Sequence, residues 1–240
     1  MFQYSLLYKE FVEVSPGVRL HIPTVGEILD FGEKRYYDAA FILSAMPYDV
    51  MVYLHDAGVD FSKITDYELF LSLFPAQESD KVSLILPDLN PRDFAVVYNK
   101  NTQEKELLNL ADGRIINRVA QTQIGEILRT INFWKKNTNK PANPEAYEYM
   151  IYKARKRLKR ARRKEDKREL ERLIIALVNC SEFKYDFNSV REINIYALNA
   201  CVRQILNRLN YEQVMGGVYA GTVDYSKLNK STLDWLDGSL

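Results

Sequence analysis

A run of sixteen residues from Lys153 to Arg168 carries eleven lysines and arginines and only two acids, so it cannot enter a hydrophobic core. The formal charge of this run is +9, whereas the whole chain of 240 residues carries only +1. The remaining 224 residues hold 22 bases and 30 acids, which leaves them at −8. The sequence therefore indicates a slightly acidic body with one concentrated basic segment.

The apolar residues around the start of this run follow a 4-3-4-3 spacing, which places them on one narrow stripe of a helix. Basic side chains occupy nearly all of the remaining helix surface. We therefore expect a helix that touches the body along one edge and otherwise projects into solvent. The stripe consists of Tyr147, Ile151, Ala154, Leu158 and Ala161.

No apolar residue follows Ala161 until Leu170, and nine residues at about 100° each reverse the face of a helix. Two arrangements fit this reversal. Either the chain bends near 163–168 and forms two antiparallel helices, which we favour, or one long helix presents opposite faces to different partners. The second stripe consists of Leu170, Leu173, Ile174, Leu177 and Val178.

The first third of the chain shows a β-hairpin followed by helices. Alternating residues on either side of Pro16-Gly17 predict the hairpin and place His21 on its polar face. A helix is expected from Thr24 to about Ala45, a second after Pro47 that stops at Gly58, and a third from Thr65 to before Pro75. Thr24 and Thr65 are each followed by a glutamate three residues later, the spacing of a capping box.

The rest of the chain predicts a small mixed unit and then helices. The segments 82–86, 94–100 and 105–110 read as strands, with a tight turn at Asp112-Gly113. Further helices are expected over 119–135, from Pro144 after the linker 137–144, and over 189–209. A glycine-permitted bend at 216–222 and a short helical turn carrying Trp235 complete the prediction.

These elements predict an α+β fold that is mainly α-helical. It comprises an N-terminal β-hairpin with helices, a small middle β-meander with a helix, and a C-terminal helical bundle with a projecting basic helical hairpin. The predicted subdomains cover residues 1–78, 79–136 and 144–240.

The sequence contains no recognisable motif for catalysis, cofactor binding or metal binding, and no such residue is assigned. Cys180 and Cys201 lack zinc-ligand spacing and are expected to be small buried hydrophobes. The glycines of 216–222 lack the lysine of a phosphate-binding loop. We expect a non-enzyme without a cofactor, although a carboxylate pair would leave no local signature.

The apolar runs are too short to span a bilayer, and the start has no signal-peptide pattern. We therefore expect a cytoplasmic protein without a membrane partner.

The basic run is the candidate site, and three interpretations remain open. It is a solvated surface, a surface for electrostatic docking onto an acidic protein such as another copy of the chain, or a phosphate-binding element. The run lacks aromatic residues and base-reading amides, which disfavours specific nucleic-acid recognition. The candidate docking residues are Lys153, Arg155, Lys156, Arg157, Lys159, Arg160, Arg162, Arg163, Lys164, Lys167 and Arg168.

Three passages resemble a family of small proteins of long-tailed bacteriophages and prophages of Gram-positive bacteria. They are "HIPTVGEILDFG" (21–32), "IYALNACVRQI" (195–205) and "GGVYAGTVDYSKLNKSTLDWL" (216–236), and the middle section is compatible with the same family. Such proteins are regarded as tail-assembly chaperones.

The resemblance implies a non-catalytic role in tail morphogenesis, with the tape-measure or tail-tube protein as partner and the host cytoplasm as the location. The alternatives are a structural virion protein of the tail or neck and a nucleic-acid-binding protein that uses residues 153–168. The resemblance does not cover the basic run and supplies no site residues.

Overall fold

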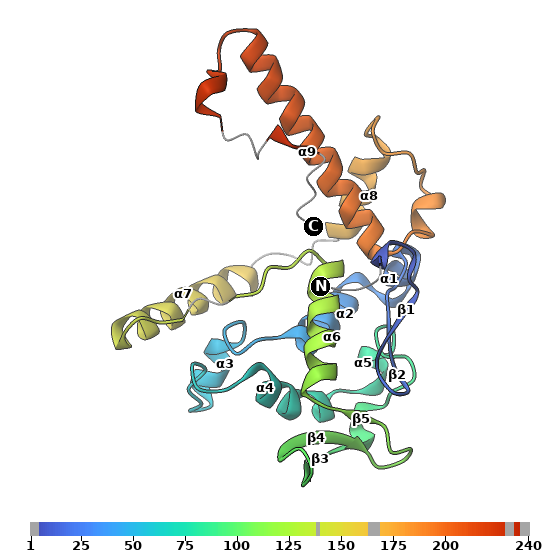
Figure 1. Ribbon diagram of the computed structural model, residues 1–240, viewed down its shortest axis with the longest axis vertical. Helices are drawn as coiled ribbons and strands as arrows, with labels where there is room; N and C mark the ends of the chain where they lie inside the picture. Colours follow the sequence, from blue (N-terminus) through green and yellow to red (C-terminus); the bar gives the residue numbers. More distant parts are fainter. Residues whose placement is uncertain (1–4, 138–139, 163–168, 229–232, 236–240) are drawn as a thin grey trace.

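The computed structural model describes residues 5–137, 140–162, 169–228 and 233–235, with the side chain of Arg162 left out (Figure 1). The mainly helical α+β fold predicted from the sequence is confirmed, with small antiparallel sheets beside the helices. The predicted bend at 163–168 lies outside the described residues. The helices are α1 (Val25–Phe31), α2 (Glu33–Ser44), α3 (Met51–Asp56), α4 (Asp66–Leu73), α5 (Ser79–Val82), α6 (Arg118–Ile131), α7 (Pro144–Arg162), α8 (Glu169–Val178) and α9 (Ile195–Tyr219).

The N-terminal hairpin pairs β1 (Phe11–Ser15) with β2 (Val18–His21) in antiparallel register, as predicted. The placement of His21 on a polar face was wrong, because this side chain is buried. Its Nδ1 lies 2.9 Å from the carbonyl oxygen of Leu84, and its ring stacks on Phe11 at 4.8 Å. The segment around Leu84 thus covers the side of the hairpin that the sequence pattern assigned to solvent.

Both predicted capping boxes are present. The Thr24 N–H donates to Glu27 at 2.7 Å before α1, and the Thr65 N–H donates to Glu68 at 2.8 Å before α4. The single helix expected from Thr24 to Ala45 is instead two helices, α1 and α2. Gly32 separates them with a φ of 103°, a backbone conformation that favours glycine.

The strand predicted over 82–86 was also wrong. This segment is the end of α5 and a turn, and its apolar side chains Val82, Ile85 and Leu86 point into the core. A short apolar run cannot by itself distinguish a strand from another buried segment. Among the described residues one backbone hydrogen bond links it to a sheet, from the His21 N–H to the Ile85 carbonyl at 2.9 Å.

A small middle meander is present as predicted, built from β3 (Phe94–Asn99), β4 (Glu104–Asn109) and β5 (Ile115–Ile116), paired in that order. Two of its strands match the prediction, but the third, β5, was not predicted and stands in place of the strand expected over 82–86. The helix after it, α6, ends at Ile131 rather than at Lys135, because Phe133 takes a φ of 56° and turns the chain. Four apolar side chains of α6 at core spacing are fully buried, namely Ile124, Ile127, Leu128 and Ile131.

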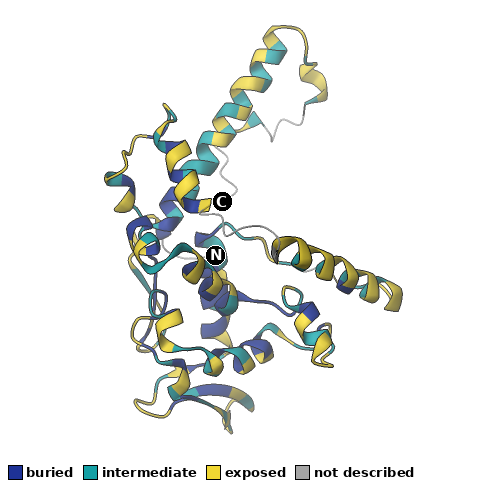
Figure 2. Cartoon of the chain, turned by 180° about the vertical axis from the view of Figure 1, so that it is seen from behind, coloured by how far each residue is buried: buried dark blue, intermediate teal, exposed yellow. Residues whose placement is uncertain are grey.

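The main hydrophobic cluster runs from Leu6 to Leu198 and includes buried residues of the hairpin, of α2, of α6 and of α8. The three predicted subdomains therefore share one core, with α6 near its centre (Figure 1). In Figure 2 the buried residues gather in this central region, whereas α7 and the far part of α9 are coloured mainly as exposed or intermediate.

The C-terminal helix differs from the prediction at both ends. It begins at Ile195 and continues to Tyr219, so Gly216 and Gly217 lie inside the helix and not in the expected loop. The bend comes later, at Gly221. Cys180 and Cys201 are half-buried at the edge of the core rather than fully buried, and burial raises the pKa of the Cys201 thiol.

Candidate interaction surfaces

The helix α7, which carries the basic run, packs on α3 through a second and much smaller hydrophobic cluster. Ile151 is only 3% exposed and lies with Met51, Val52 and Phe61. Tyr147 stacks on Phe61 with ring centroids 4.6 Å apart. The predicted apolar stripe is thus confirmed over most of its length, although its last member, Ala161, is exposed.

Six of the eleven candidate docking residues have described side chains, and all six are exposed on α7. Arg155 pairs with Asp56 of α3, and this ion pair fixes α7 to its neighbour. Arg162 ends the helix, while Arg163, Lys164, Lys167 and Arg168 lie outside the described residues. The six are Lys153, Arg155, Lys156, Arg157, Lys159 and Arg160.

Two exposed tyrosines precede the basic residues on the same helix. Tyr149 is 56% exposed and Tyr152 is 60% exposed, and the Lys153 Nζ lies 4.8 Å from the centre of the Tyr149 ring. These tyrosines are not among the candidate docking residues predicted from the sequence. The sequence spacing could have identified them. Tyr149, Lys153, Lys156 and Arg160 stand at i, i+4, i+7 and i+11, which places them on one face of a helix.

The helix α9 is firmly anchored at its first turn. The Ile195 N–H donates to the Pro23 carbonyl, and the Val25 N–H donates to the Ile193 carbonyl, both at 2.9 Å. The Asn194 side chain caps the helix by accepting from the Ala197 N–H at 2.8 Å. This base ties the helix to the start of α1.

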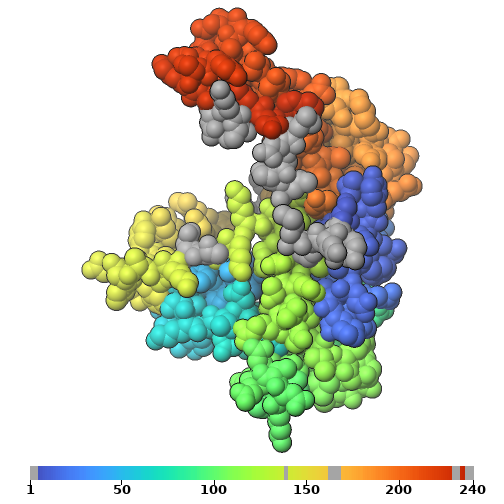
Figure 3. All heavy atoms as spheres, in the orientation of Figure 1, coloured from blue at the N-terminus to red at the C-terminus, as the bar shows by residue number. Residues whose placement is uncertain are grey.

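Beyond its first turns α9 leaves the body. The helix has 25 residues and is about 37 Å long, but its buried residues are Ile195, Ala197 and Leu198 alone among those described. In Figure 3 its far end and α7 stand out as two separate projections.

The outer part of α9 carries a half-buried apolar stripe with the spacing i, i+3, i+4 and i+7. None of the four residues belongs to either hydrophobic cluster of the described part of the chain. We call them the outer α9 stripe: Tyr211, Val214, Met215 and Val218.

The chain after α9 folds back on it in two described places. Val223 packs against Gly217, where an added Cβ would lie 2.8 Å from a Val223 methyl group. The Gln204 side chain donates to the carbonyl oxygen of Trp235 at 2.9 Å, which ties the residue to α9. The close approach of Val223 explains why a glycine is present inside the helix.

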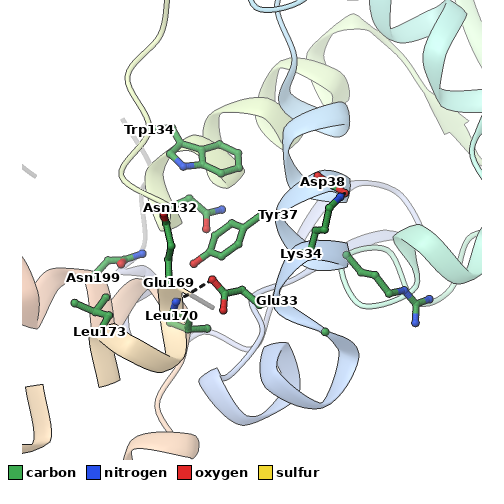
Figure 4. Close-up of a pocket in the computed structure, with 12 residues that line it drawn as sticks. Glu33, Lys34, Tyr37, Asp38, Asn132, Trp134, Glu169, Leu170, Leu173 and Asn199 are labelled. Carbon is green, nitrogen blue, oxygen red and sulfur yellow. Dashed lines mark hydrogen bonds and ion pairs between the residues drawn. The ribbon is translucent and has the colours of Figure 1, made fainter. Parts of the chain in front are cut away.

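A cleft of about 880 Å³ lies between α2, the end of α6 and the start of α8 (Figure 4). The rings of Tyr37 and Trp134 lie 6.2 Å apart on its wall, and Glu33 accepts a hydrogen bond from the Leu170 N–H at 2.8 Å. Burial, followed by the carboxylates of Glu33 and Glu169, raises the pKa of Tyr37 to about 12. This phenol therefore stays protonated at neutral pH and cannot act there as a base.

Two features are absent from the described residues. In that part of the chain no group of three or more His, Cys, Asp or Glu side chains could hold a metal ion. None of its helices combines the length and the apolar character needed to cross a membrane.

Comparison with family models, with curated proteins and with solved structures gave no match to this chain.

Proposed function

We propose that this protein is a non-catalytic factor of phage tail morphogenesis, a tail-assembly chaperone that binds the tape-measure or the tail-tube protein in the host cytoplasm. The observation that carries the proposal is the outer α9 stripe, an apolar helix face held away from both hydrophobic clusters. The resemblance of residues 21–32, 195–205 and 216–236 to the chaperone family points to the same role.

In this role the outer α9 stripe covers apolar segments of an unassembled tail protein until polymerisation begins. An amphipathic helix binds such segments reversibly, because apolar side chains at i, i+3, i+4 and i+7 form one continuous contact line. The hydrogen bonds at Asn194 and Ile195 anchor the first turn of α9 to the body, while the outer half of the helix contacts the tail protein.

The proposal predicts that two charges on the stripe abolish partner binding. Met215→Glu/Val218→Glu places carboxylates in the contact, where they must be desolvated without a partner. The matched control, Leu206→Glu/Gln213→Glu, adds the same charges to exposed positions on the opposite side of the same helix.

The measurement is a pull-down after co-expression with the tape-measure or tail-tube protein. We expect recovery with the wild type and the control, and its loss with the stripe variant. Recovery of neither tail protein by the wild type would refute the proposal.

Mass spectrometry of purified particles separates the chaperone from the structural alternative, because a chaperone is absent from the finished virion. Light scattering of the purified chain tests whether a second copy occupies the stripe. A dimer that the stripe variant converts to a monomer would assign this surface to self-association.

A further inference from the structure

We propose that the exposed face of α7 binds single-stranded nucleic acid without sequence preference. The face consists of Tyr149, Tyr152, Lys153, Lys156 and Arg160, and we call it the α7 outer face. This inference does not depend on the proposed function, because it concerns a different helix.

The α7 outer face lies opposite the side that packs on α3. At about 100° per residue, Tyr149, Lys156 and Arg160 fall within a narrow sector directly across from Tyr147, Ile151 and Leu158. The packing with Met51 and Phe61 therefore fixes the helix and leaves this face open to solvent.

Two arginines of the described chain show how a cation can join separate parts of the fold. Arg19 pairs with Asp88 at 2.6 Å and Arg191 pairs with Asp30 at 2.8 Å, and both contacts join separate segments of the body. On α7, Arg155 forms a similar ion pair with Asp56 of α3, which joins the two helices.

The neighbouring cations on α7 are not used in this way. Within the described residues, no acidic side chain pairs with Lys156, Arg157, Lys159 or Arg160. The Lys153 ammonium lies over the Tyr149 ring and forms no ion pair with a described acidic side chain. Clustered cations without acidic partners attract a polyanion, and they bind it in a salt-dependent way.

The tyrosines decide which polyanion fits. The carboxylates of an acidic polypeptide would pair with the cations, but they would not stack on the two exposed aromatic rings of the same face. A single-stranded nucleic acid uses both features, since phosphates pair with the cations and unpaired bases stack on the rings. Residues 144–160 contain no asparagine or glutamine to read base edges, which predicts tolerance of any base sequence.

The test measures binding of the full chain to fluorescein-labelled oligothymidine by anisotropy, from about 50 to 200 mM salt. We expect binding at low salt and a steep loss as salt rises. Lys156→Ala/Arg160→Ala removes two phosphate contacts, so the slope of log K against log salt should fall by about 1.4.

The tyrosine variants test stacking. Tyr149→Ala/Tyr152→Ala should weaken binding by about fivefold or more per ring while leaving the salt slope unchanged. Tyr149→Phe/Tyr152→Phe should keep the affinity, because phenylalanine also stacks. The matched control is Tyr98→Ala/Lys100→Ala on and beside β3, where Tyr98 is 61% exposed, and it should bind as the wild type does.

Three results would overturn the proposal. The first is an absence of binding by the wild type at low salt, and the second is equal affinity for duplex DNA and for the single strand. The third is competition by polyglutamate as effective as that of unlabelled oligothymidine, which would assign the face to acidic proteins. Circular dichroism of each variant confirms that the helix content is unchanged.

Discussion

Tyr36 is the largest side chain that α2 buries completely, and its hydroxyl donates to the Asn132 Oδ1 at 3.2 Å. The Asn132 amide in turn donates to the Leu128 carbonyl at 2.9 Å. Burial raises the pKa of Tyr36 well above its ordinary value, so the phenol remains a donor. This buried pair joins α2 to the end of α6 beside the cleft of Figure 4.

Removing that donor should lower stability. Tyr36→Phe leaves the Asn132 oxygen buried without a donor, and we expect the free energy of unfolding to fall by about 1–3 kcal/mol. Urea denaturation measures the change. Tyr37→Phe is the control, because the neighbouring Tyr37 hydroxyl forms no hydrogen bond with a described residue. Equal losses for the two variants would contradict this account.

Residue-level signals succeeded where the relevant partner lies close in the chain. Thr24 with Glu27 and Thr65 with Glu68 could be recognised because each cap is complete within four residues. His21 could not be placed, since its burial depends on Leu84, which is 63 residues away.

At the scale of elements, the cap of α4 links helix stability to pH. The Thr65 backbone N–H, and then the Thr65 hydroxyl, hold the pKa of Glu68 below its ordinary value. A lowered folded-state pKa means that the unfolded chain binds the proton more readily. The stability that Glu68 contributes is therefore full above about pH 4.3 and is lost as pH falls through the lowered folded-state pKa.

The corresponding variant is Glu68→Gln, which keeps an acceptor for the Thr65 N–H but cannot titrate. We expect wild type to be more stable than the variant near neutral pH, and the difference to disappear at a pH below the folded-state pKa of Glu68. Urea denaturation at the two pH values measures this. A difference that stays constant with pH would show that the Glu68 charge does not stabilise α4.

Element ends were predicted less well than element types. The helix expected over 189–209 is present, but Gly216 and Gly217 lie inside it and do not end it. Gly217 is needed there because Val223 packs where a larger side chain would stand. The strand expected over 82–86 failed for a related reason. Its apolar residues are buried by tertiary contacts that the local pattern does not contain.

At the scale of the whole molecule, two hydrophobic clusters of unequal size hold the described part of the chain together. The main cluster contains α6, whereas α7 depends on the small one around Ile151 and Phe61. The spacing of apolar residues predicted the narrow packing stripe of α7, but it could not show that this stripe packs on α3. That partner lies about a hundred residues earlier, as the pairing of Arg155 with Asp56 shows.

The unequal clusters predict local rather than global unfolding of α7. Ile151→Ala should speed amide hydrogen exchange in α7 and α3 while leaving exchange in α6 unchanged, because few buried contacts hold α7. Ile124→Ala in the main cluster should instead speed exchange throughout, with a stability loss of about 2–5 kcal/mol. Faster exchange in α6 after Ile151→Ala would mean that the clusters unfold together.

The hydrogen bond from the Ile195 N–H to the Pro23 carbonyl also affects the order of events on the ribosome. Its two partners, residues 23 and 195, are separated by 172 positions in the sequence. At a synthesis rate of 5–20 residues per second, residue 195 is therefore made roughly 10 to 30 s after residue 23. The outer half of α9 is made after both. The chain can therefore close its body before its projecting apolar helix emerges, which limits the time during which that helix meets an unfolded copy of its own chain.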